Sequence, residues 1–194
     1  TSLCTPPPHR DYSVHLKRDG LKGARIGIPR AFYFNKQLIP GEKEPRGGLN
    51  EAQAKAMADA IAVLKAQGAE IVDPADIPSV IDPDPAKNLI GWNFCAGLPE
   101  AKGKDADCTT VVKYGMKRDF NKWLATLGPN APVKTLTELR QWNLAHEKGG
   151  AIKYGQARLD ISDEMDVEKD QARYLTDQAK DFLLTKTNGI DAVM

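Results

Sequence analysis

The side chains that most often attack or deprotonate a substrate are few and scattered in this sequence. Serine occurs at four positions, each isolated from the others: Ser2, Ser13, Ser79 and Ser162. Nucleophilic catalysis by serine or cysteine needs a general base within hydrogen-bond reach. Only His9, His15 and His146 offer an imidazole, and none of them lies in a catalytic motif. We therefore predict no catalytic residues and no complete catalytic site within the 194 positions.

Metal-ligating residue types come together at one place only, at His9, Asp11 and His15. This segment follows a proline triplet in an extended lead-in, and a poorly fixed segment makes a poor preformed metal site. Asp82 and Asp84 alternate with prolines, a spacing that favours a turn over convergence on an ion. The sequence therefore predicts no metal ion, and no glycine-rich phosphate-binding motif supports a nucleotide or other cofactor.

The three cysteines are too few for a disulfide scaffold and form no Cys-x-x-Cys pair. Cys95 and Cys108 stand on either side of a stretch rich in glycine, lysine and aspartate, so they could close a loop by a disulfide. Free, partly buried thiols are the other reading. The residues leave both states open, and they do not decide the compartment.

Charge and hydropathy exclude several classes of partner. The chain has 27 Lys and Arg residues against 26 Asp and Glu, which gives no net field to hold nucleic acid or an anionic membrane. A mean hydropathy of -0.45 leaves no membrane-spanning run and is typical of a soluble globular protein. No targeting signal is present to indicate a location.

The first half of the sequence predicts a strand, a helix and a second strand. Leu21 to Ile28 has strand character, and Asn50 with Gln53 forms a capping box that begins a helix. Gly68 ends this helix, and Glu70–Val72 is a short strand. This order favours a parallel pair of strands joined by a helix.

Helices dominate the second half. One helix has apolar residues at three- and four-residue steps: Val112, Met116, Phe120, Trp123, Leu124 and Leu127. Gly115 inside it predicts close packing of another helix. Another helix begins at Thr135, which is predicted to form a second capping box with Glu138. The last helix, from about Asp166, is expected to turn one apolar face inward: Leu175, Ala179, Phe182 and Leu183. A final strand is predicted at Ile190–Met194, so we expect residues 1–20 as an extended lead-in and residues 21–194 as one α/β segment, incomplete at both ends.

Several segments, taken in order, resemble the middle and later part of amidase-signature enzymes. They are Gly20-Leu21-Lys22-Gly23-Ala24-Arg25-Ile26-Gly27-Ile28-Pro29-Arg30, Gly68 to Pro74, Tyr114 to Phe120 with Trp123-Leu124, Pro132 to Leu136 with Glu138-Leu139, Tyr154-Gly155-Gln156, and Gly189 to Val193. The resemblance implies a helix-rich, partial α/β/α sandwich around a mixed β-sheet. It also implies hydrolysis of carboxamides through a serine acyl-enzyme, without metal or organic cofactor.

The family's catalytic lysine and serine-rich stretch have no counterpart in this sequence, so no catalytic residue carries over. The resemblance places Tyr154 and Gln156 in the wall of a substrate pocket, with ordinary packing as the alternative. It implies a small-molecule amide as the substrate of the parent enzyme. It also implies association with the missing remainder of the domain or with a second copy. The other reading of the chain is a non-catalytic α/β binding or regulatory domain on an amidase-like scaffold.

Overall fold

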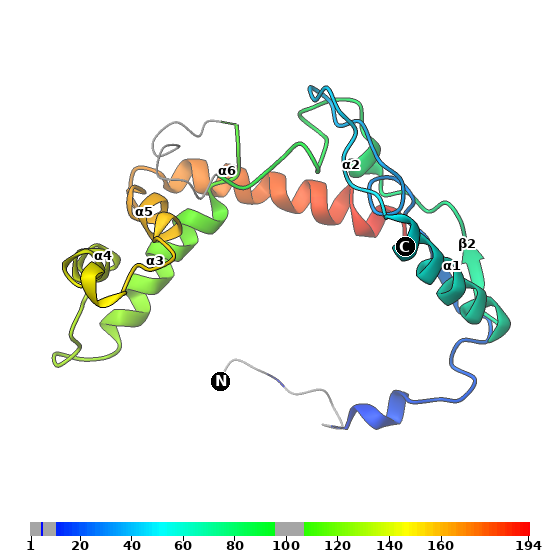
Figure 1. Ribbon diagram of the computed structural model, residues 1–194, viewed down its shortest axis with the longest axis horizontal. Coiled ribbons are helices and arrows are strands. Elements are labelled where there is room, and N and C mark those ends of the chain that lie inside the picture. Colours follow the sequence, from blue (N-terminus) through cyan, green and yellow to red (C-terminus); the bar gives the residue numbers. More distant parts are fainter. Residues whose placement is uncertain (1–4, 6–10, 96–106) are drawn as a thin grey trace. The chain divides into compact units, whose positions relative to one another are not determined.

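The computed structural model describes residues 5, 11–95 and 107–194 (Figure 1). The described residues fall into two compact units. The first comprises parts of residues 1–38, 42–77 and 193–194, and the second comprises parts of residues 39–41 and 78–192. Within the described residues, no helix combines the length and the apolar character that a bilayer crossing requires.

The first unit contains two short parallel strands and one long helix. Strand β1 (Arg25–Gly27) pairs with β2 (Glu70–Val72), with Ile26 opposite Ile71. Helix α1 (Glu51–Ala66) connects them, as the sequence predicts. A single 3-10 turn, η1 (Tyr12–His15), lies in the predicted lead-in and is capped by the side chain of Asp11.

The capping box at the start of α1 is confirmed. The Asn50 side chain accepts a hydrogen bond from the Gln53 amide at 2.9 Å, and the Gln53 side chain accepts one from the Asn50 amide at 3.0 Å. Ile61 is the buried residue of this helix, whereas Met57 is 39% exposed on the same apolar face. Helix α1 is therefore held mainly by local contacts.

The second unit is almost entirely helical. Its elements, in chain order, are α2 (Pro78–Ile81), α3 (Val111–Ala125), α4 (Leu136–Ala145), η3 (Glu147–Gly149), α5 (Ala157–Asp163), α6 (Gln171–Phe182), the π-helical turn η4 (Leu183–Thr187) and η5 (Ile190–Ala192). Helix α3 packs against α4, α5 and α6. Helix α6 continues into η4 as one rod (Figure 1).

Two stacked tyrosines form the centre of the second unit. The rings of Tyr114 on α3 and Tyr174 on α6 lie 4.4 Å apart and nearly parallel, and Met165 completes the buried cluster. The Tyr114 hydroxyl donates to the Val167 carbonyl at 2.5 Å. This hydrogen bond satisfies the polar end of a ring that is only 1% exposed.

Two sequence predictions for this part of the chain are wrong. The expected strand at Ile190–Met194 is instead the 3-10 turn η5, because no strand among the described residues offers it a hydrogen-bonding partner. A Cβ at Gly115 would meet no atom within 4 Å, so no described helix packs closely there.

Helix α6 also turns the other way from the prediction. Tyr174, Asp177 and Leu184 are buried along α6 and η4, whereas Leu175 and Phe182 are 53% and 60% exposed. Hydrogen bonds from other parts of the unit to aspartates of this helix fix that orientation.

Candidate functional site

An apolar cavity of about 360 Å³ lies between α3 and α5. Helix α3 forms one wall and α5 forms the other. The segment that ends at Cys95 closes one side. The lining residues are Phe94, Cys95, Val112, Lys113, Met116, Arg158, Leu159, Ile161 and Ser162. A cavity of this size and lining is suited to a small apolar group.

Lys113 is the buried cation of this cavity. Its side chain is 6% exposed, and its ammonium group lies 2.6 Å from Oε1 of Glu164. Oε2 of Glu164 is buried without a hydrogen-bond donor among the described residues. Burying a charge is tolerated when the charge is paired, so Glu164 is what allows Lys113 to stay inside.

Ser162 lies in the same lining but is engaged elsewhere. It is 3% exposed, and its hydroxyl donates to the Arg158 carbonyl one helical turn earlier, at 2.6 Å. The other buried serine, Ser79, donates to the Leu184 carbonyl at 2.7 Å. Both hydroxyls thus point at main-chain oxygens, and neither is hydrogen-bonded to a base that would make it a nucleophile.

A second hollow, of about 540 Å³, contains the two residues that the family resemblance placed in a pocket wall. Tyr154 and Gln156 both line it. The Gln156 side chain accepts a hydrogen bond from the side-chain amide of Asn143 at 3.1 Å, whereas Tyr154 is 91% exposed. Arg158 and Leu159 line both hollows, so the two are neighbours on α5. A role of Tyr154 and Gln156 in substrate binding stays a prediction.

Gly155, between these two residues, is explained by backbone conformation. Its φ angle is 75°, in the left-handed region that favours glycine. A Cβ at this position would meet nothing within 4 Å. Among the described residues, no neighbouring surface approaches this glycine.

Charged residues hold α4 onto α5 beside the hollows. Arg140 donates to Asp160 and to Asp163, each at 2.6 Å, and the Thr137 hydroxyl donates to Asp163 at 2.7 Å. Burial acts to raise the pKa of Asp163, but the hydrogen bonds from Thr137 and Arg140 and the charge of Lys117 outweigh it and leave the pKa lowered. Asp163 therefore joins α5 to α4 as an anion held by Thr137 and Arg140.

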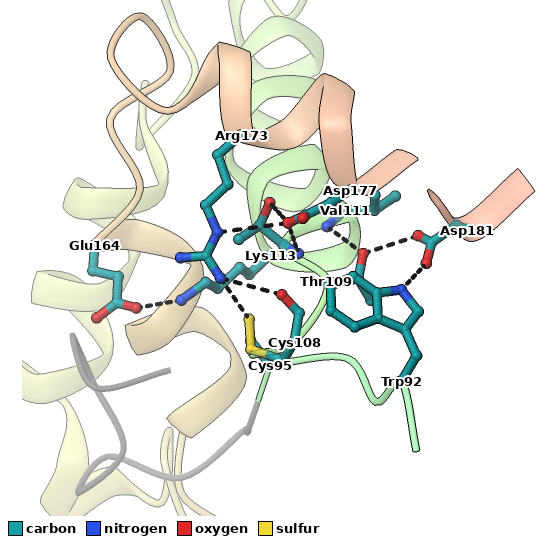
Figure 2. Close-up of a disulfide and its surroundings, with 11 residues drawn as sticks. Trp92, Cys95, Cys108, Thr109, Val111, Lys113, Glu164, Arg173, Asp177 and Asp181 are labelled. Atoms are coloured by element: carbon teal, nitrogen blue, oxygen red, sulfur yellow. Dashed lines mark hydrogen bonds and ion pairs between the residues drawn. A yellow bond between two sulfur atoms is a disulfide. The ribbon is translucent and has the colours of Figure 1, made fainter. Parts of the chain in front are cut away.

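A disulfide joins Cys95 to Cys108 in the structure, with Cα atoms 5.0 Å apart (Figure 2). Arg173 of α6 donates to the Cys108 carbonyl at 3.2 Å and lies beside Cys95. Next to the disulfide, Asp177 accepts hydrogen bonds from both the amide and the hydroxyl of Thr110, each at 2.8 Å. This network fixes the start of α3 against α6.

The same helix holds a tryptophan through a second aspartate. The Trp92 indole donates to Asp181 at 2.7 Å, and the Thr109 hydroxyl donates to the other carboxylate oxygen at 2.9 Å (Figure 2). The ammonium group of Lys180 lies 3.7 Å from the centre of the indole ring. Sequence reasoning missed both aspartates, because their partners lie far away in the chain.

The remaining candidates have structural roles where the structure describes them. Asp11 caps η1, and His9 lies outside the described residues. His146 ends α4 and stacks on Trp142 with ring centres 4.0 Å apart. Asp82 and Asp84 cap successive turns. Across residues 5, 11–95 and 107–194, no group of three metal-ligating side chains converges.

Comparison with known proteins identifies the fold. No family model matches the chain, and no curated protein matches it. Among solved structures, it is similar to the peptide amidase PAM in complex with the competitive inhibitor chymostatin, with a TM-score of 0.65, 22% identity and coverage of 99% of this chain and 31% of that one. It is also similar to an amidase family protein from Bacillus anthracis str. Ames, with a TM-score of 0.54, 23% identity and coverage of 92% and 27%. The chain thus has an amidase-like fold and spans less than a third of these proteins.

Proposed function

We propose that this chain is a portion of an amidase-signature enzyme that hydrolyses carboxamide C–N bonds through a serine acyl-enzyme, with its catalytic residues outside these 194 positions. The observation that carries the proposal is the fold likeness to two amidases over 92% and 99% of the chain. The sequence resemblance, which runs in the same order along most of the chain, supports the same family.

The proposed reaction divides the work between this chain and the rest of the enzyme. A serine oxygen supplied from elsewhere attacks the amide carbonyl, the amine leaves with a proton, and water then hydrolyses the ester. This chain contributes binding surface. The apolar cavity between α3 and α5 would accept an uncharged part of the substrate, and Tyr154 and Gln156 would contact another part from the neighbouring hollow.

The proposal also extends the architecture. The parallel pair β1–β2 would be part of a larger mixed sheet in a partial α/β/α sandwich, because purely parallel strands are normally covered on both faces. Two strands with open edges invite pairing with further strands. The partner that completes the sheet would be the remainder of the amidase domain or, as the other possibility, a second copy of this chain.

A non-catalytic binding or regulatory domain is the second candidate. The observation in its favour is an apolar cavity whose two buried polar side chains are both engaged within the chain. The ammonium group of Lys113 forms an ion pair with Glu164, and the Ser162 hydroxyl donates a hydrogen bond to the Arg158 carbonyl.

Labelling of the intact native protein with a serine-reactive phosphonate, followed by peptide mapping, separates the candidates. The hydrolase proposal expects the label on a serine outside these 194 residues, together with turnover of simple amides. The isolated chain should show neither labelling nor turnover. A label on Ser79 or Ser162 would overturn the proposal, and a native protein without label or turnover would favour the binding domain.

A further inference from the structure

Helix α6 turns aspartate side chains inward on one face and exposes large apolar side chains on the other, which is the reverse of an ordinary surface helix. The face toward the rest of its unit carries Asp177 and Asp181, which hold Thr110, Thr109 and Trp92 by hydrogen bonds. Asp177 is only 7% exposed, and Tyr174 and Leu184 are buried beside it. An ordinary surface helix would direct its charged residues to solvent and its apolar stripe inward.

The opposite face of α6 is apolar and uncovered. We call it the outer strip, and it consists of Leu175, Ala179 and Phe182 of α6 and Leu183 at the start of η4. These positions follow the i, i+4, i+7, i+8 spacing that places side chains on one helical face. Leu175 is 53% exposed, Phe182 60% and Leu183 45%. A contiguous apolar strip of large side chains marks a surface that is normally covered.

The inner face cannot exchange places with the outer strip. Rotating the helix to bury the strip would break the hydrogen bonds of Asp177 and Asp181 and leave the amide of Thr110, which is fully buried, without its acceptor. The polar anchors therefore commit the strip to face away from its own unit. The strip is therefore available to a surface outside this unit.

We infer that the outer strip of α6 docks against an apolar layer of the remaining part of an amidase-like domain. The choice of this occupant rests on the proposed function and on the coverage of 27% and 31% of the similar structures, which leaves more than two thirds of that fold to be supplied elsewhere. The strip itself has no charged side chain, so its partner surface is apolar too. A helix that packs on one face against its own unit and on the other against the remainder of the domain lies inside that domain.

Thiol accessibility in the intact native protein tests the inference. Phe182→Cys places a thiol in the strip, and Val63→Cys is the matched control, because Val63 is also 60% exposed but lies in α1, outside the apolar face of Met57 and Ile61. Maleimide labelling at position 182 should be roughly tenfold or more slower than at position 63, because a covered thiol is shielded from the reagent. Mapping the labelled peptides separates these thiols from the native cysteines. Equal labelling rates at the two positions would overturn the inference.

A benzophenone-maleimide attached to the thiol at position 182 identifies what covers the strip. A crosslink to a peptide outside the 194 residues, within an amidase-like domain that carries the serine-rich catalytic stretch, supports the inference. A crosslink to any peptide of these 194 residues, in the same or a second copy, overturns it. Amide turnover by the unmodified protein is measured separately, so a shielded strip without hydrolysis rejects the function alone. Hydrolysis with an unshielded strip rejects the docking surface alone.

Discussion

The ion pairs described in the first unit all have side chains at least partly open to solvent, whereas the second unit contains several ion pairs that are largely buried. In the first unit, Lys55 and Asp59 pair at 2.7 Å with both side chains more than two thirds exposed. In the second, Lys113 and Glu164 pair at 2.6 Å with side chains 6% and 12% exposed. Water and salt weaken the first kind of pair, but removing one partner of the second leaves a charge with no solvent to stabilise it.

This difference shows which unit depends on tertiary contacts. In the first unit, the start of α1 is specified by a cap within a few residues, although β1 and β2 still have to meet across the chain. The second unit requires residues 51 or 67 positions apart to meet before its charges are satisfied. Substitutions in the two units should therefore differ in size, and the following three measurements test that expectation.

The largest effect is expected from Glu164→Leu. This change leaves the Lys113 ammonium buried without its counter-charge, which should lower the free energy of unfolding by about 3 kcal/mol or more. The double change Lys113→Met with Glu164→Leu should recover most of the loss, because no buried charge remains. Urea denaturation of the three proteins measures both differences. If the double variant were as unstable as the single one, packing rather than charge would explain the loss.

A smaller loss is expected from Asp177→Ala, which removes the acceptor for the Thr110 amide and hydroxyl. Hydrogen bonds to a buried carboxylate predict a decrease of about 2 to 3 kcal/mol in the free energy of unfolding. Asp59→Ala removes an exposed carboxylate from α1 and should change the free energy by less than about 0.5 kcal/mol. Equal losses in the two variants would contradict the contrast between the units.

Apart from the Asp59→Ala control, the smallest effect is expected at the start of α1. Asn50→Ala removes the side-chain acceptor for the Gln53 amide and should cost about 1 kcal/mol. Asn50→Asp keeps an acceptor and should restore nearly all of that loss. Hydrogen exchange of the first-turn amides of α1 measures the effect locally. A loss that the aspartate does not restore would place the role of Asn50 outside helix capping.

Local signals in the sequence predicted local structure well. The capping box of Asn50 and Gln53 and the parallel strand pair are present as predicted. Thr135 accepts the expected hydrogen bond from the Glu138 amide at 3.1 Å, but the Glu138 side chain accepts from Lys134 and not from Thr135. The reciprocal half of that second capping box is therefore replaced by a neighbouring donor.

The candidate site was less predictable. Tyr154 and Gln156 were chosen from a family resemblance and do line a hollow. Nothing near Lys113 in the sequence points to its pairing with Glu164, 51 positions away. With 53 charged residues in the chain, spacing alone could not select this pair.

The sequence by itself determined where most helices and both strands of the parallel pair lie, because caps, turns and apolar periodicity act over three or four residues. It also determined that α6 has an apolar face. Only the tertiary structure decided that this face points away from its unit, since the hydrogen bonds of Asp177 and Asp181 come from residues far away in the chain. It likewise decided that Ile190–Ala192 forms a turn, because a strand exists only beside a partner.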